Sequence, residues 1–167
     1  YYLKTLPSPE VDALRGKKFL NVKGKGISAK ASNYKLPVEN KGICEILIDL
    51  NAENAKDVDI TLSNAKGEKV VMNFNPSESK FSFDRTQSGV TDFSKDFPAV
   101  VWAPTLRDSK EQKLRIFVDT SSMEVFDAEG NFVLTNLVFP NEPYSQISFS
   151  SKGGNARLNS MEIYNIK

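Results

Sequence analysis

Alternation of apolar and polar residues with a period of two is the feature that most constrains the fold of this chain. In residues 57–63, Val58, Ile60 and Leu62 alternate with two aspartates and a threonine. Successive side chains of a β-strand point to opposite faces, so this pattern predicts a strand with one buried face and one solvated face. An amphipathic helix would instead repeat its apolar residues every three or four positions.

The same pattern recurs along most of the chain, and turns separate its segments. The turns at 64–67, 128–131 and 152–155 contain Asn and Gly, which favour tight reversals. Strands are predicted at 19–23, 34–39, 43–51, 57–63, 69–74, 80–85, 100–103, 113–119, 122–127, 131–136, 146–150 and 156–166. About twelve short strands at this spacing predict an all-β fold, a two-sheet antiparallel β-sandwich of the jelly-roll or concanavalin-like kind.

Residues 1–15 differ from the rest of the chain. Ser8 is a favourable helix N-cap, and Pro9 suits the first helical position. Glu10 and Asp12 place negative charge in the first turn, where the helix dipole favours it. We therefore predict that 1–15 form an interdomain linker segment with a helical turn, and that 16–167 form the β-sandwich domain.

The linker segment carries more apolar side chains than a free terminus needs. They form an N-terminal apolar cluster of Tyr1, Tyr2, Leu3, Leu6 and Leu14. An exposed patch of this kind usually marks an interface. We expect the cluster to pack along the sandwich edge and face another domain, with Pro7 and Pro9 stiffening the connection. In the chain alone, the same patch would favour weak self-association.

The composition excludes several classes of function. The 167 residues suit one domain, and 22 basic against 21 acidic residues leave no net field that would attract nucleic acid or an anionic membrane. No apolar run is long enough to span a membrane. The chain has no histidine and one cysteine, which removes His-based triads, zinc sites and internal disulfides. Neither a metal nor another cofactor is expected.

The single cysteine lies in a predicted strand. Cys44 shares the parity of Ile46, Ile48 and Leu50, which predicts that it faces the core. We therefore interpret it as a small buried hydrophobic residue, in preference to a reactive thiol.

The segment 113–126, which reads K-L-R-I-F-V-D-T-S-S-M-E-V-F, predicts a β-hairpin with Leu114, Ile116, Val118, Met123 and Val125 on one face. Its amino-acid sequence resembles the R-I-F-V-D-x-S-S-x-E-V-F signature of glycoside hydrolase family 32, which includes invertases, inulinases and levanases. Further motifs follow the order found in that family: F-D-R-T-Q-S-G at 83–89, F-S-K-D-F at 93–97, F-V-L-T at 132–135 and V-F-P at 138–140. Thr120 departs from the pattern, because many relatives carry arginine there.

The resemblance implies that this chain is the C-terminal β-sandwich of such an enzyme. The family places its catalytic carboxylates in an N-terminal β-propeller, in W-M-N-D-P-N-G, R-D-P and E-C segments, and none of the three occurs here. The expected function is therefore a non-catalytic domain that stabilises the propeller of the same protein, a β-fructosidase acting on levan, inulin or sucrose. No catalytic residue is expected in this chain. A secreted, periplasmic or cell-surface location is implied by the resemblance alone.

The alternative is a carbohydrate-binding module that holds fructan. Sugar sites combine an aromatic face with charged hydrogen-bonding partners, because a hydroxyl both donates and accepts. The candidate sugar-binding residues are Asp84, Arg85, Trp102, Arg115, Asp119 and Glu124. A competing interpretation makes Asp84–Arg85 and Arg115–Glu124 structural ion pairs that fix the two sheets together.

Overall fold

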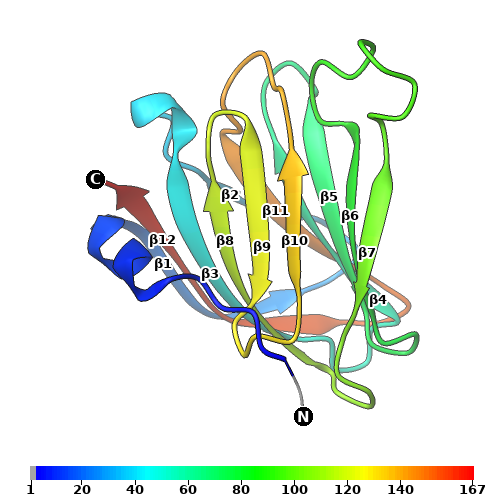
Figure 1. Ribbon diagram of the computed structural model, residues 1–167. Coiled ribbons are helices and arrows are strands. Elements are labelled where there is room, and N and C mark those ends of the chain that lie inside the picture. The colour runs from blue at the N-terminus through cyan, green and yellow to red at the C-terminus, as the bar shows by residue number, and fades with distance from the viewer. Residues whose placement is uncertain (1–2) are drawn as a thin grey trace.

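The chain forms a two-layer β-sandwich, as predicted. The computed structural model describes residues 3–167, and Figure 1 shows two sheets packed face to face. Each sheet has six strands, and every strand pairing is antiparallel. Within the described residues, neither of the two short 3-10 turns has the length or the apolar character that a membrane span requires.

The two sheets have distinct strand orders. Sheet A contains, in spatial order, β1 (Arg15–Ile27), β12 (Ala156–Ile166), β3 (Cys44–Asn51), β8 (Glu111–Val118), β9 (Ser122–Asp127) and β10 (Val133–Leu137). Sheet B contains β2 (Ser32–Lys35), β11 (Gln146–Lys152), β4 (Asp57–Ser63), β5 (Lys69–Asn75), β6 (Lys80–Gln87) and β7 (Val100–Pro104). The 3-10 turns are η1 (Pro9–Leu14) and η2 (Asn40–Gly42). The predicted helical turn after Ser8 is therefore confirmed.

The observed strand bounds agree with the predicted ones where apolar and polar residues alternate clearly. β4, β9 and β12 have the predicted bounds. β1 is longer than the predicted 19–23, because it is an edge strand that buries only Val22 and Ile27. The length of β1 is set by its backbone pairing with β12. The alternation of side chains does not predict this pairing. β2 ends at Lys35, four residues earlier than predicted.

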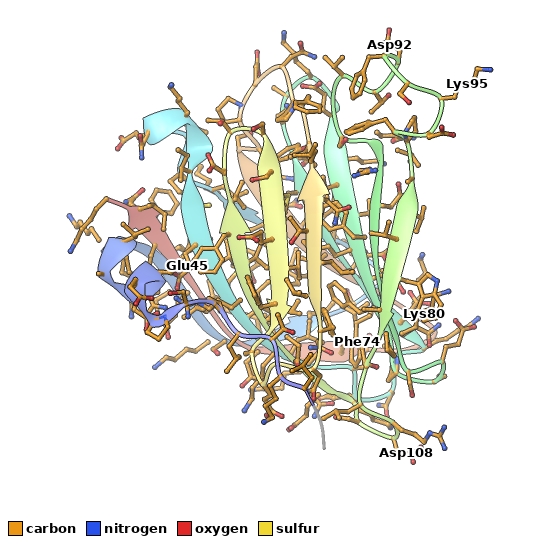
Figure 2. The ribbon with its side chains drawn as sticks, in the orientation of Figure 1. Glu45, Phe74, Lys80, Asp92, Lys95 and Asp108 are labelled. Atoms are coloured by element: carbon orange, nitrogen blue, oxygen red, sulfur yellow. The ribbon has the colours of Figure 1, made fainter. Side chains whose placement is uncertain are left out.

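The core lies between the sheets and is made by the inward-facing side chains of both. The predicted hairpin face is confirmed, since Leu114, Ile116, Val118, Met123 and Val125 are all buried. Large aromatic side chains fill the space opposite them, among them Phe74, which lies between the sheets in Figure 2.

Cys44 belongs to this core. Its thiol is buried, and burial raises its pKa to about 12, so the side chain stays protonated at neutral pH. The predicted role as a small hydrophobic residue is therefore confirmed.

Three of the sequence motifs meet at one end of the sandwich. The guanidinium of Arg85 lies 4.5 Å from the ring centre of Phe97, and its Nε donates a 2.8 Å hydrogen bond to the Phe97 carbonyl. Phe93 and Phe139 pack against the Phe97 ring at 4.6 and 5.5 Å between centroids. Ser88, fully buried, donates through Oγ to the carbonyl of Arg85 at 2.8 Å. These motif residues thus form a structural cluster that closes this end of the core.

Gly89 explains why the motif at 83–89 ends in glycine. Its φ of +146° lies in a region that side chains rarely adopt, and an added Cβ would lie 2.2 Å from the carbonyl oxygen of Phe139. The next residue, Val90, donates its N–H to the same carbonyl at 2.9 Å. The backbone of this loop therefore packs directly on the chain at Phe139 and Pro140, and only glycine fits.

Gly89→Ala is expected to destabilise the fold by about 2 kcal/mol or more, from backbone strain and overpacking. In thermal unfolding this corresponds to a lowering of the midpoint by about 4–8 °C. Gly26→Ala is the matched control, since a Cβ at Gly26 meets nothing within 4 Å and its backbone is not strained. Equal midpoints for the two variants would contradict the proposed contact.

Candidate functional site

A fully buried carboxylate lies on the outer face of sheet A. Glu45 is on β3 between Cys44 and Ile46, which face the core, so alternation points its side chain away from the second sheet. Its side chain is nevertheless 0% exposed. Figure 2 shows Glu45 beside the N-terminal turn. A buried charge is tolerated only when it is paired and hydrogen-bonded.

Two arginines from distant parts of the sequence supply that pairing. Arg15, at the end of η1, donates through Nε to Glu45 Oε1 at 2.9 Å, and its Nη2 forms an ion pair with the same oxygen. Arg115 of β8 places Nη2 3.4 Å from Glu45 Oε2 and 2.6 Å from Oδ1 of Asp12. Although burial lowers the pKa of Arg15, the hydrogen bond and charge of Glu45 raise it more. The Arg15–Glu45–Arg115–Asp12 network therefore fixes η1 against β3 and β8.

Backbone contacts extend this attachment to both ends of the N-terminal segment. The N–H of Thr5 donates to the carbonyl of Gly130 at 2.9 Å, and the N–H of Lys167 donates to the carbonyl of Leu14 at 2.8 Å. As Figure 1 shows, the segment crosses in front of sheet A. Residues 3–14 are thus held in one place along the sheet.

A mainly apolar groove of about 530 Å³ lies between this segment and the outer face of β8, β9 and β10. The rings of Phe117 and Phe126 meet edge to face, with centroids 6.0 Å apart, and form part of its floor. Further apolar lining comes from Leu6, Val11 and Leu14, and polar lining comes from Asp119, Glu124 and Thr135. We call this feature the linker groove.

The N-terminal apolar cluster lies beside the linker groove in part. Leu6 and Leu14 line the groove and remain about half exposed, and Leu3 is 93% exposed. Tyr1 and Tyr2, which complete the predicted cluster, lie outside the described residues. The leucines therefore leave apolar surface available beside the groove.

The six candidate sugar-binding residues fall into two groups on different sheets. Arg115, Asp119 and Glu124 belong to the β8–β9 hairpin of sheet A, where Asp119 and Glu124 line the linker groove. The other three, Asp84, Arg85 and Trp102, belong to β6 and β7 of sheet B. The fold does not bring the six into one pocket.

The interpretation of Asp84–Arg85 and Arg115–Glu124 as structural ion pairs is wrong. Arg115 pairs with Glu45 and Asp12 in place of Glu124. The buried Glu45 has more to gain from a cation than the solvated Glu124, whose carboxylate accepts a 3.4 Å hydrogen bond from Thr135.

The second expected pair fails because both partners have closer ones. Arg85 binds Phe97, and the carboxylate of Asp84 accepts hydrogen bonds from the N–H and hydroxyl of Thr86 at 2.8 and 2.6 Å. Adjacent residues in a strand point to opposite faces, which keeps Asp84 and Arg85 apart.

The sequence analysis did not identify Asp12, Arg15 and Glu45 as members of one charge network. A signal was available, because Glu45 is the only charged residue in the otherwise apolar run from Ile43 to Ile48. A carboxylate in such a run needs a cationic partner. The identity of the partners depends on the fold, since Arg15 and Arg115 lie 30 and 70 residues away.

The chain brings another pair of carboxylates together on the outer face of sheet B. Asp57 and Asp59 of β4 both accept hydrogen bonds from the side-chain amide of Asn73, at 3.1 and 2.7 Å. Asp59 also lies 3.2 Å from the ammonium of Lys152. These two carboxylates lie on an outer sheet face beside an amide and a cation.

No group of three or more His, Cys, Asp or Glu residues that could hold a metal ion occurs in the part of the chain that the structure describes.

The chain is thus a two-sheet antiparallel β-sandwich with an N-terminal segment held on sheet A, and comparison with known proteins shows its family. The family model described as "Glycosyl hydrolases family 32 C terminal" matches residues 10–165. The chain belongs to this family.

Individual relatives agree with the family assignment. The chain is 32% identical over 131 residues to a levanase of Bacillus sp. (strain L7), covering 74% of this chain and 14% of that protein. It is 31% identical to a sucrose-6-phosphate hydrolase of Staphylococcus xylosus, covering 80% of this chain and 26% of that protein. The crystal structure of exo-inulinase from Aspergillus awamori superposes with a TM-score of 0.86 at 26% identity, over 99% of this chain and 32% of that one. The chain thus spans a third or less of each of these relatives.

Glu45→Gln is expected to cost about 2 kcal/mol or more of unfolding free energy, because it leaves two neighbouring arginines without their shared anion. Partial exposure of both arginines, 32% and 17%, lets water offset part of the loss. Urea unfolding measures the effect. In the control Glu162→Gln, which removes the exposed pair with Lys18, the expected cost is below about 1 kcal/mol. If the two substitutions cost the same, the Glu45 network does not stabilise the fold.

Proposed function

We propose that this chain is the non-catalytic C-terminal β-sandwich of a β-fructosidase, and that it stabilises an N-terminal β-propeller that carries the catalytic residues. The observation that carries the proposal is the linker groove with its fixed N-terminal segment. An apolar surface of this size beside a rigidly held linker suits a permanent contact with another domain of the same protein. The propeller is the occupant to which the family resemblance points.

The charge network gives the proposed contact a defined geometry. Asp12 lies in η1 and Arg15 follows it directly, and the two are held by Arg115 and Glu45 to central strands of sheet A. A linker held in this way fixes the direction from which the preceding domain approaches. The sandwich would then support the propeller as a rigid body, with Leu3, Leu6 and Leu14 covered in the joint.

The names of the relatives support a proposal for the substrate of the whole protein. Levanase, exo-inulinase and sucrose-6-phosphate hydrolase are named among them. We therefore propose levan, inulin or sucrose as the substrate class. Two relatives named extracellular exo-inulinase support a secreted, periplasmic or cell-surface location.

The isolated chain is expected to release no fructose from sucrose, inulin or levan. Glycoside hydrolysis needs an acid and a nucleophile or base on either side of the bond, and the catalytic motifs of the family are not in this sequence. Reducing-sugar release is measured against a buffer blank and against Asp59→Asn, which alters the carboxylate pair that shares the Asn73 amide. Activity that disappears in Asp59→Asn would contradict the non-catalytic role.

Attachment to the propeller is expected to slow amide hydrogen exchange at Thr5–Leu14 and along β10, which borders the linker groove. The comparison is between this chain alone and the longer protein that carries the propeller. β7, the edge strand of the opposite sheet, provides the internal control, and its exchange should be the same in both. Equal exchange at Thr5–Leu14 in the two proteins would show that the segment is only a tether.

A further inference from the structure

The outer face of sheet B carries a row of side chains that neither the proposed function nor the linker groove uses. In the strand register, Asp59 of β4 pairs with Asn73 of β5, Asn73 pairs with Ser82 of β6, and Ser82 pairs with Trp102 of β7. Residues paired in this way lie side by side on one face of a sheet. With strands about 4.8 Å apart, the row extends about 14 Å, which is longer than a single sugar ring. We call it the sheet B row.

Trp102 is the feature of the row that the fold does not need. It is the only tryptophan of the chain, it lies on an edge strand, and it is 60% exposed. The ammonium of Lys80 lies 4.9 Å from its ring centre. Lys80, labelled in Figure 2, points outward from the sandwich beside β7. A tryptophan ring presents a large flat apolar surface with a polar edge, and leaving it in water forgoes the energy of burial.

The rest of the row offers both kinds of hydrogen-bonding group. The amide nitrogen of Asn73 is occupied by Asp57 and Asp59, which orients its side-chain carbonyl as an acceptor. In residues 3–167 neither that carbonyl nor the hydroxyl of Ser82 has a hydrogen-bond partner within the chain. Sugar hydroxyls donate and accept, so a surface with fixed acceptors, a hydroxyl and an ammonium matches them.

The charges around the row favour an uncharged ligand. Three carboxylates, Asp57, Asp59 and Asp84, are matched by three ammonium groups, Lys69, Lys80 and Lys152. Lys152 is already paired with Asp59. A balanced face of this kind has no net field to attract a nucleic acid, an anionic lipid surface or an acidic peptide.

We propose that the sheet B row is a binding platform for a neutral oligosaccharide. The apolar face of one sugar ring stacks on Trp102, and hydroxyls of the following units reach Ser82 and Asn73 across β6 and β5. The ligand lies across the strands, along the row. This inference does not rest on the proposed function, because the N-terminal segment and the linker groove are on sheet A.

The sole tryptophan makes the proposal directly measurable. We expect the fluorescence of Trp102 to change saturably on titration with at least one of three probes: inulin, levan or a β-1,4-linked glucan oligosaccharide. The three probes separate a fructan ligand from a glucan ligand. No saturable change with any of them would overturn the proposal.

Affinity electrophoresis in gels containing the active probe tests the residues. Trp102→Ala is expected to weaken binding about tenfold or more, and Asn73→Ala to weaken it severalfold. Trp102 is on the solvated face, so Trp102→Ala should unfold at nearly the same temperature as the parent chain. Asn73→Ala also loses the hydrogen bonds to Asp57 and Asp59, so its binding is measured well below its unfolding temperature. Leu137→Ala is the matched control, because Leu137 is 53% exposed on the edge strand of sheet A. Its migration should equal that of the parent chain.

Two other outcomes would contradict the platform. Binding that persists unchanged in Trp102→Ala would place the ligand elsewhere on the molecule. A Trp102→Ala variant that loses self-association in sedimentation while its glycan binding is unchanged would make β7 an interface between copies of this chain. Either result leaves the propeller contact unaffected, because exchange at Thr5–Leu14 tests that contact separately.

Discussion

The packing of sheet A on sheet B is the constraint on which the rest of the structure depends. It commits one face of each sheet to a shared apolar core, in which the Phe74, Phe81 and Phe83 side chains are completely buried. The two outer faces remain available for contacts with other molecules or domains, together with the edge strands and the end loops. The linker groove and the sheet B row lie on opposite outer faces.

The two outer faces have different chemistry. Sheet A carries a buried carboxylate, two arginines and an apolar groove beneath a fixed N-terminal segment. Apolar surface and desolvated charges suit a permanent contact, because both require the exclusion of water. Sheet B carries an open polar surface and one exposed tryptophan. Such a surface suits a reversible ligand that replaces water contacts one by one. A domain could thus be attached through one sheet and bind a ligand through the other.

The motifs that carry the family resemblance have mainly structural roles. The arginine of the motif at 83–89 closes the end of the core on Phe97, its serine is buried beneath the loop, and its glycine permits close contact with Phe139. The hairpin signature places Arg115 in the network around Glu45. These motif residues therefore close the sandwich and hold its N-terminal segment, which fits a chain without the catalytic motifs.

The sequence by itself determined the fold class, most strand positions and the buried face of the strands in which apolar and polar residues alternate clearly. β4 and β9 alternate clearly, so side-chain parity was enough to place Ile60 and Val125 in the core. Only the tertiary structure decided which polar residues meet. Glu45 selects Arg15 and Arg115 because β3 lies beside β8 and under η1, and the row from Asp59 to Trp102 exists because β4 to β7 pair in one register. Local pattern fixes the face on which a side chain lies, whereas its neighbours depend on strand order and register, which are set by packing across the whole domain.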